Sequence, residues 1–124
     1  LLAIPYLGYA DLNDEKYIST RNFILSTENP EFHIGKYASG VGSPHTPEGY
    51  IWHISLAMQG LTTDDVNKKR ELLEIMKNTD AGTYLMHEGF HPDDPNKFTR
   101  DWFSWANMMF CELVLDYCGI KVKK

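Results

Sequence analysis

A glutamate flanked by two histidines is the first feature of the sequence that could do chemistry. It lies in the segment His87-Glu88-Gly89-Phe90-His91. The spacing matches H-E-x-x-H, in which two histidines bind zinc and the glutamate activates a metal-bound water. That chemistry requires a helix, because only there do residues i and i+4 share a face. Gly89 and Pro92 disfavour a helix here, so we expect no metal site and keep a zinc hydrolase only as an alternative.

Without a metal, Glu88 has two interpretations. A carboxylate on a loop can take a proton from water and act as a general base. It can equally cap a helix end or form an ion pair, for instance with Arg100. The catalytic interpretation is favoured because other polar and aromatic residues lie near predicted loop-to-helix junctions, where active sites are commonly built. These residues are His45, His87, His91, Arg100, Trp102 and Trp105.

The N-terminal half of the chain is predicted to hold two helices around a long loop. Asn13 or Asp14 can cap the first helix. A Gly/Ser-rich loop follows over residues 30–46, and its length favours a functional role. Thr46-Pro47 then predicts an N-cap and first turn, which open a second, largely apolar helix over residues 47–59.

The C-terminal half is predicted to hold two more helices, again separated by a loop. Thr62 and Asp65 resemble a capping box that opens the third helix. The loop of residues 83–94 carries the glutamate, and Asp94-Pro95 or Thr99 begins the last helix. No stretch shows sustained alternation with a period of two. The predicted fold class is therefore all-α, with helices in antiparallel pairs.

Composition and charge exclude several classes of function. With 124 residues, 43% hydrophobic and 23% charged, the chain has the composition of one globular domain. The net charge is −5 and the basic residues form no phosphate-binding stripe, so we expect no nucleic-acid partner. No apolar run approaches the roughly 20 residues that span a bilayer, so we expect no membrane partner either.

The two cysteines are predicted to be free thiols. Cys111 and Cys118 lie seven residues apart in the last predicted helix. A rise of about 1.5 Å per residue separates their backbones by roughly 10 Å, which is too far for a disulfide. Free thiols favour a reducing compartment, so we expect a cytoplasmic protein.

Several motifs, in their order along the chain, resemble glycoside hydrolase family 125, the metal-independent exo-α-1,6-mannosidases. The resemblance covers nearly the whole chain, and a set of ordered motifs is far more specific than one short pattern. The segments that carry it are Gly42-Ser43-Pro44-His45-Thr46-Pro47, Tyr50-Ile51-Trp52-His53-Ile54, Thr79-Asp80-Ala81-Gly82-Thr83, His87-Glu88-Gly89-Phe90-His91, Asp93-Asp94-Pro95 and Phe98-Thr99-Arg100-Asp101-Trp102-Phe103-Ser104-Trp105-Ala106-Asn107.

The resemblance implies that residues 1–124 form the C-terminal part of a single (α/α)6 catalytic barrel whose upstream part is absent. It also implies removal of terminal mannose from α-1,6-linked mannosides or N-glycan fragments, with inversion and with no metal or other cofactor. Glu88 would be the general base. An inverting enzyme also needs a general acid, which the resemblance places in the missing upstream segment. The isolated chain is therefore expected to be inactive.

Five residues are candidates for substrate binding. His45 and Arg100 can hydrogen-bond mannose hydroxyls, although Arg100 can instead pair with an acidic neighbour. His91 can orient the base or contact the sugar, and His87 can equally be structural. The full candidate set is Ser43, His45, Tyr50, His91 and Arg100.

Three further residues have competing interpretations. His53 lies in an apolar helical segment and is predicted to be a core histidine with satisfied hydrogen bonds. Trp102 and Trp105 could stack against a sugar, although an aromatic pair at this spacing more often belongs to a core. A non-catalytic carbohydrate-binding or structural helical fragment remains the alternative to an enzyme, and it predicts uncovered apolar helix faces.

Overall fold

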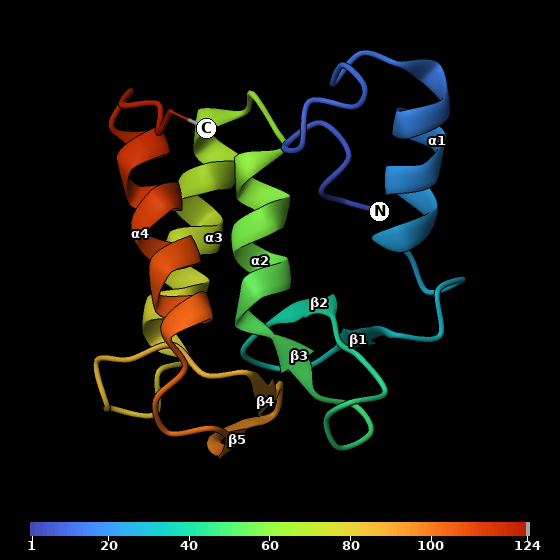
Figure 1. Ribbon diagram of the computed structural model, residues 1–124. Coiled ribbons are helices and arrows are strands. Elements are labelled where there is room, and N and C mark those ends of the chain that lie inside the picture. Colours follow the sequence, from blue (N-terminus) through green and yellow to red (C-terminus); the bar gives the residue numbers. More distant parts are fainter. Residues whose placement is uncertain (124) are drawn as a thin grey trace.

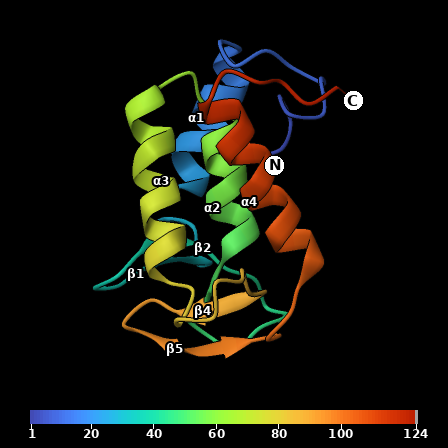
Figure 2. The same ribbon diagram turned by 90° about the vertical axis from the view of Figure 1, so that its left-hand side faces the viewer.

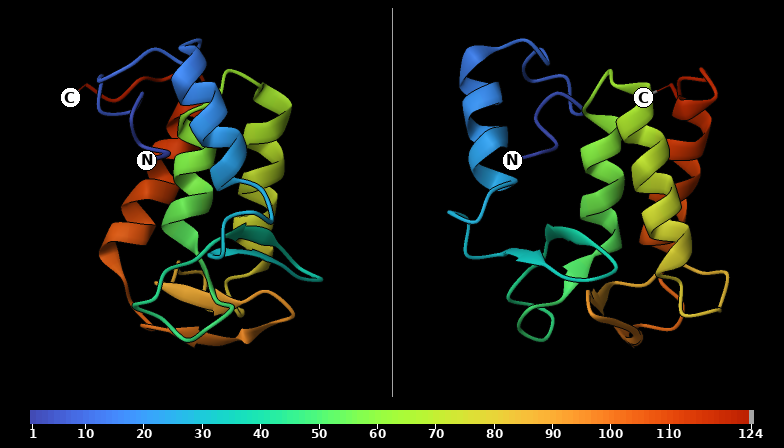
Figure 3. Two further views of the ribbon diagram at one scale, coloured as in Figure 1. Left: turned by 90° about the vertical axis from the view of Figure 1, so that its right-hand side faces the viewer. Right: turned by 180° about the vertical axis from the view of Figure 1, so that it is seen from behind.

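Three helices stand side by side, and short strands lie across one end of them (Figures 1 and 2). The computed structural model describes residues 1–123. The three helices are α2 (His53–Leu61), α3 (Val66–Asn78) and α4 (Ser104–Tyr117). A further helix, α1 (Glu15–Ile24), precedes them and lies on the far side of α2 from α4 (Figures 1 and 3). Within the described range, no helix is long and apolar enough to cross a membrane.

Side-chain caps set the starts of α1 and α3. The carboxylate of Asp14 accepts a hydrogen bond from the amide of Tyr17 at 2.9 Å, which selects Asp14 over Asn13 as the cap. Asp65 likewise accepts from the amides of the second and third residues of α3, at 3.0 and 3.1 Å. The predicted start of α1 is confirmed. In α3 the cap is Asp65 itself and not Thr62, whose hydroxyl donates to the carbonyl of Met58 at the end of α2 at 2.7 Å.

The chain is not all-α, because the described residues include five short strands in segments predicted as loops or helix starts. The strands β1 (Phe32–Ile34) and β2 (Ser39–Val41) form a hairpin inside the predicted long loop. The strands β3 (Ile51–Trp52), β4 (Gly89–His91) and β5 (Asp94–Thr99) form an antiparallel sheet in that order. Most of these strands have two or three residues, which is too short for a visible period-two alternation.

Two predicted helix starts are wrong. The hydroxyl of Thr46 donates to the carbonyl of Ser43 at 3.1 Å and accepts from the indole of Trp52 at 3.0 Å. It therefore caps no helix, and α2 begins only after β3. Neither Asp94-Pro95 nor Thr99 begins the last helix, because both lie in β5 and α4 begins at Ser104. Proline is tolerated there because β5 is at the edge of its sheet.

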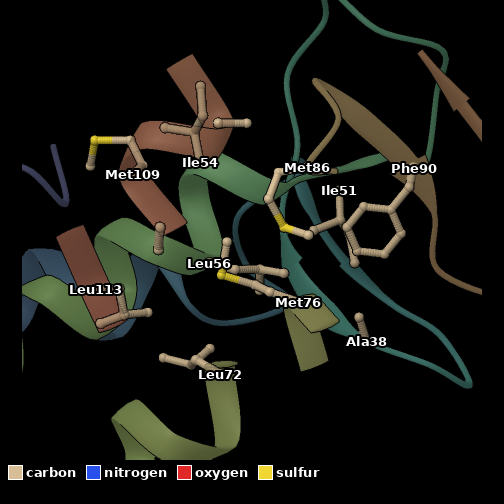
Figure 4. Close-up of a cluster of buried hydrophobic side chains, with 12 residues drawn as sticks. Ala38, Ile51, Ile54, Leu56, Leu72, Met76, Met86, Phe90, Met109 and Leu113 are labelled. Atoms are coloured by element: carbon tan, nitrogen blue, oxygen red, sulfur yellow. The ribbon is translucent and has the colours of Figure 1, made fainter. Parts of the chain in front are cut away.

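The core lies between α2, α3 and α4 and continues onto the sheet (Figure 4). Leu56, Leu72 and Leu113 supply one fully or almost fully buried side chain from each helix, and Phe90 extends the cluster from β4. Gly60 lies inside α2, where a methyl group would meet Leu113 Cδ1 at 2.7 Å. This close approach packs α2 against α4, and the shared core fixes the sheet to the end of the helices.

Candidate active site

The predicted site residues lie at the sheet end of the helices (Figure 1). Glu88 immediately precedes β4, and Arg100 immediately follows β5. The pairing of Gly89 with Thr99 brings these two ends together. Tyr50 immediately precedes β3, the other neighbour of β4. The sheet therefore brings Glu88 and Arg100 together at one end of β4 and places Tyr50 at the other end, beside His91.

Two donors hold the carboxylate of Glu88. Its Oε2 accepts a hydrogen bond from Arg100 Nε at 3.2 Å, and its Oε1 accepts one from Thr99 Oγ1 at 3.3 Å. The side chain of Glu88 is only 17% exposed, whereas that of Arg100 is 61% exposed. The ion pair weighed at the sequence level is thus present. It leaves an oriented, mostly covered carboxylate at the edge of solvent.

The backbone beside Glu88 is fixed by the same strand pair. Glu88 N donates to the carbonyl of Thr99 at 3.2 Å, and Gly89 N donates to Thr99 Oγ1 at 3.1 Å. Gly89 also packs closely on the preceding loop, since a Cβ there would meet Thr46 Cγ2 at 3.1 Å. Thr99 therefore contacts both the main chain and the carboxylate, a role that no local sequence signal indicated.

Tyr50 and His91 form a second contact on the sheet. Their rings meet edge to face, with 5.8 Å between centroids and 80° between planes. The Nδ1 of His91 accepts from the amide of Asp93 at 3.1 Å, so a neutral His91 carries its proton on Nε2. The described contacts of the Glu88 carboxylate are with Thr99 and Arg100, not with His91.

Ser43 and His45 lie on the loop between β2 and β3. Ser43 lines a surface cavity of about 400 Å³, and its Oγ accepts from the amide of His45 at 3.3 Å. His45 is exposed. The cavity also receives Glu31 and His33 from the hairpin, residues that sequence reasoning missed because this segment was interpreted as a plain loop. In the described structure no hydrogen bond joins Ser43 or His45 to Glu88.

The two tryptophans near Arg100 do not belong to the core. Trp102 is 78% exposed and Trp105 is 57% exposed, so the core interpretation is wrong for both. Beside them, the guanidinium of Arg100 lies over the ring of Phe103, at 5.4 Å from its centroid. The indole of Trp102 remains accessible for stacking, and that of Trp105 lies on the exposed apolar side of α4.

The zinc-binding pattern lacks its geometric requirement. Residues 89–91 form β4, so His87 and His91 do not lie on one face of a helix. The ring of His87 is fully buried and occupied by hydrogen bonds, while His91 faces Tyr50. Among residues 1–123, no group of three His, Cys, Asp or Glu side chains could hold a metal ion.

His53 is a core histidine with satisfied hydrogen bonds, as predicted. Its Nδ1 accepts from the amide of His87 at 2.8 Å, and its Nε2 donates to Thr79 Oγ1 at 3.0 Å. The ring stacks on Phe90 with 4.5 Å between centroids. Burial, followed by the proximity of His87, lowers the pKa of His53 to about 3.

We expect acid to destabilise the fold through His53. Its pKa falls from 6.5 when unfolded to about 3 when folded, so the unfolded chain binds more protons between these values. The stabilisation is complete above pH 6.5 and is lost below it by up to about 1.4 kcal/mol per pH unit. Denaturant midpoints between pH 5 and 7 would show a shallower pH dependence for His53→Gln. An identical slope in both proteins would contradict the assignment.

Comparison with known proteins places the chain in a family. Residues 1–115 match the family model of the metal-independent α-mannosidases of glycoside hydrolase family 125. The chain is 59% identical, with a TM-score of 0.96, to a Streptococcus pneumoniae metal-independent α-mannosidase solved in a non-productive complex with α-1,6-mannobiose. It is 46% identical over 117 residues to the meiotically up-regulated gene 157 protein of Schizosaccharomyces pombe.

The chain belongs to glycoside hydrolase family 125, the metal-independent α-mannosidases, which confirms the resemblance. The match covers 97% of this chain and 28% of the solved one. For the Schizosaccharomyces pombe relative the shares are 94% and 23%. The chain therefore spans about a quarter of the length of these relatives.

Proposed function

We propose that this chain is the base-bearing part of an inverting exo-α-1,6-mannosidase that removes terminal mannose from mannosides or N-glycan fragments. The observation that carries the proposal is the geometry at Glu88, a mostly covered carboxylate oriented by Thr99 and Arg100. Family membership supports the reaction class. The α-1,6-mannobiose bound by the Streptococcus pneumoniae relative supports the substrate class.

In this mechanism Glu88 takes a proton from the water that attacks the anomeric carbon. A general acid on the opposite face of the sugar protonates the leaving oxygen as the glycosidic bond breaks, and the product has inverted configuration. The two carboxyl groups of an inverting enzyme lie roughly 6.5 to 9.5 Å apart. Glu88 supplies only one of them, so the upstream part of the barrel supplies the acid.

The proposed sugar contacts come from the same sheet and from the loop that precedes β3. Arg100 bonds Glu88 through Nε and is largely exposed, so its terminal nitrogens can donate to mannose hydroxyls. Tyr50 and His91 lie at the other end of β4 from Glu88, and Ser43 and His45 lie on the neighbouring loop. Each of these side chains is at least partly exposed.

We further propose that the chain completes a single (α/α)6 domain with upstream helices. Trp105, Met108 and Leu115 are 57%, 66% and 39% exposed, and their spacing places them along one side of α4. Such an apolar side requires a partner, which the remaining helices of the barrel provide. The relatives, about four times longer, have room for those helices.

A cytoplasmic location is part of the proposal. Cys111 and Cys118 are both free and exposed. Exposed thiols persist in a reducing compartment.

The test is hydrolysis of α-1,6-mannobiose by the full-length protein and by the isolated 124-residue chain, with the product anomer followed by NMR. We expect the full-length protein to release β-mannose as the first product, at a rate that a chelator does not change. The isolated chain should release none. α-Mannose as the first product would contradict inversion, and activity of the short chain would contradict the missing acid. Inactivity of both would favour the non-catalytic alternative, and loss of activity to chelator would favour the zinc hydrolase.

A further inference from the structure

His87, the residue before Glu88, is fully buried and bonded through every polar atom of its ring. Its Nδ1 lies 3.0 Å from the carbonyl oxygen of Arg100. Its Nε2 lies 3.1 Å from the carbonyl oxygen of Asp80 and 3.2 Å from Thr83 Oγ1. The proposed mechanism gives this imidazole no role, and an apolar side chain would avoid the demands of so many buried hydrogen bonds.

The partners of the ring limit where its proton lies. A carbonyl oxygen only accepts, so Nδ1 must carry a proton to bond Arg100. Nε2 likewise needs a proton to bond the carbonyl of Asp80, to which the hydroxyl of Thr83 already donates at 2.6 Å. The bond from Nδ1 to Arg100 therefore forms in the neutral tautomer that carries its proton on Nδ1 and in the doubly protonated ring.

Arg100 has a backbone conformation that needs such a constraint. Its φ is +58°, in the left-handed region that residues other than glycine rarely adopt. Conformations of this kind persist where the surroundings hold them. The bond from Nδ1 fixes the carbonyl of Arg100. The imidazole of His87 is itself held by stacking on Phe98, with 3.9 Å between ring centroids and 19° between ring planes.

We propose that His87 is a positioning residue that acts on Glu88 through Arg100. By holding the Arg100 carbonyl it keeps the left-handed turn, and that turn directs the guanidinium back to the Glu88 carboxylate at 3.2 Å. The inference rests on the proposed function, in which Glu88 is the base. A bond from the amide of His87 to His53 anchors the same segment from the other side.

Two substitutions separate this role from a role in packing. In His87→Asn the amide nitrogen occupies the place of Nδ1 and can still donate to Arg100. In His87→Gln the amide reaches the place of Nε2 and leaves the Arg100 carbonyl without its donor. Both variants lose the ring stack on Phe98, so each is the packing control of the other.

We expect His87→Gln to lower kcat of the full-length protein by about 10-fold to 100-fold, because a misplaced base slows chemistry, and to raise KM by a smaller factor, because the displaced Arg100 also contacts the sugar. His87→Asn should restore most of that loss at a similar melting temperature. Equal kcat values for the two variants would overturn the proposal. Loss of turnover in Glu88→Gln tests the proposed function separately, so the two failures are distinguishable.

A double-mutant cycle and a wild-type measurement complete the test. In an Arg100→Lys background, which lacks the guanidinium, His87→Gln should change kcat by no more than about 2-fold. An undiminished effect there would overturn the proposal. If the His87 variants do not fold, ¹⁵N-histidine NMR of the wild-type protein decides. A proton on Nδ1 of His87 is expected, and a neutral ring protonated on Nε2 alone would overturn it.

Discussion

Glu88→Gln is expected to lower kcat of the full-length protein by about 10²-fold to 10⁴-fold, the range that a general base contributes. The amide has the shape of the carboxylate but cannot take a proton from the attacking water. KM should change little, because the sugar contacts assigned to Arg100 and Tyr50 are preserved. Steady-state kinetics on α-1,6-mannobiose measure both quantities.

Two further variants make the result specific to the base. Glu15→Gln, at the start of α1 and remote from the sheet, should keep wild-type turnover. Glu88→Ala leaves space for a small anion, and azide should then attack from the vacated side and give β-mannosyl azide, which NMR identifies. Near-normal turnover in Glu88→Gln would remove Glu88 from the mechanism.

Local chemistry allowed part of the fold to be predicted. Asp14 caps α1 through a hydrogen bond to the amide three residues away, so the whole interaction is contained in a short segment. The burial of His53 followed from the apolar residues around it in sequence. Such features need no information about the rest of the chain.

The sheet could not be predicted because its stability is not local. The strands β3 and β4 are two and three residues long, and their hydrogen bonds join positions almost 40 residues apart. Thr46 has the residue type of a helix cap, but its hydroxyl is used by Ser43 and Trp52. Tertiary contacts therefore overrode the local signal, as they commonly do for short strands.

The site residues also divide into those that local sequence could predict and those whose positions depend on tertiary contacts. The Glu88 and Arg100 contact was considered from sequence, since an acidic and a basic residue near helix junctions can pair. Thr99 was missed as a partner of Glu88, because its position depends on β5 being a strand. The residues Glu31 and His33 were missed for a related reason, since a hairpin brings them to the cavity of Ser43.

Gly42→Ala is expected to give the largest loss of stability among single-methyl changes in the site. A Cβ on Gly42 would overlap the carbonyl oxygen of Tyr50. Both groups belong to the backbone, so no side-chain rotation relieves the overlap. The loop after β2 must then move away from the segment before β3, at a cost of about 3 kcal/mol. Thermal and denaturant unfolding measure the loss.

Gly40→Ala is the matched control, because its methyl group meets only side-chain ends. Its Cβ would lie 3.0 Å from Ile51 Cγ2 and from Leu56 Cδ2, groups that can shift by a few tenths of an ångström. We expect a cost of about 1 kcal/mol there. Equal stabilities for the two variants would contradict the close backbone approach at Gly42.

The same two variants test whether the close contact between the backbones of Gly42 and Tyr50 also positions the proposed sugar-binding residues. Gly42 directly precedes Ser43, and its close neighbour Tyr50 contacts His91, so separating the two segments displaces residues from both proposed sugar-binding groups. Gly42→Ala should therefore raise KM for α-1,6-mannobiose even at temperatures where the variant is fully folded. Gly40→Ala should leave KM near the wild-type value. A folded Gly42→Ala protein with unchanged KM would show that these residues do not bind the sugar.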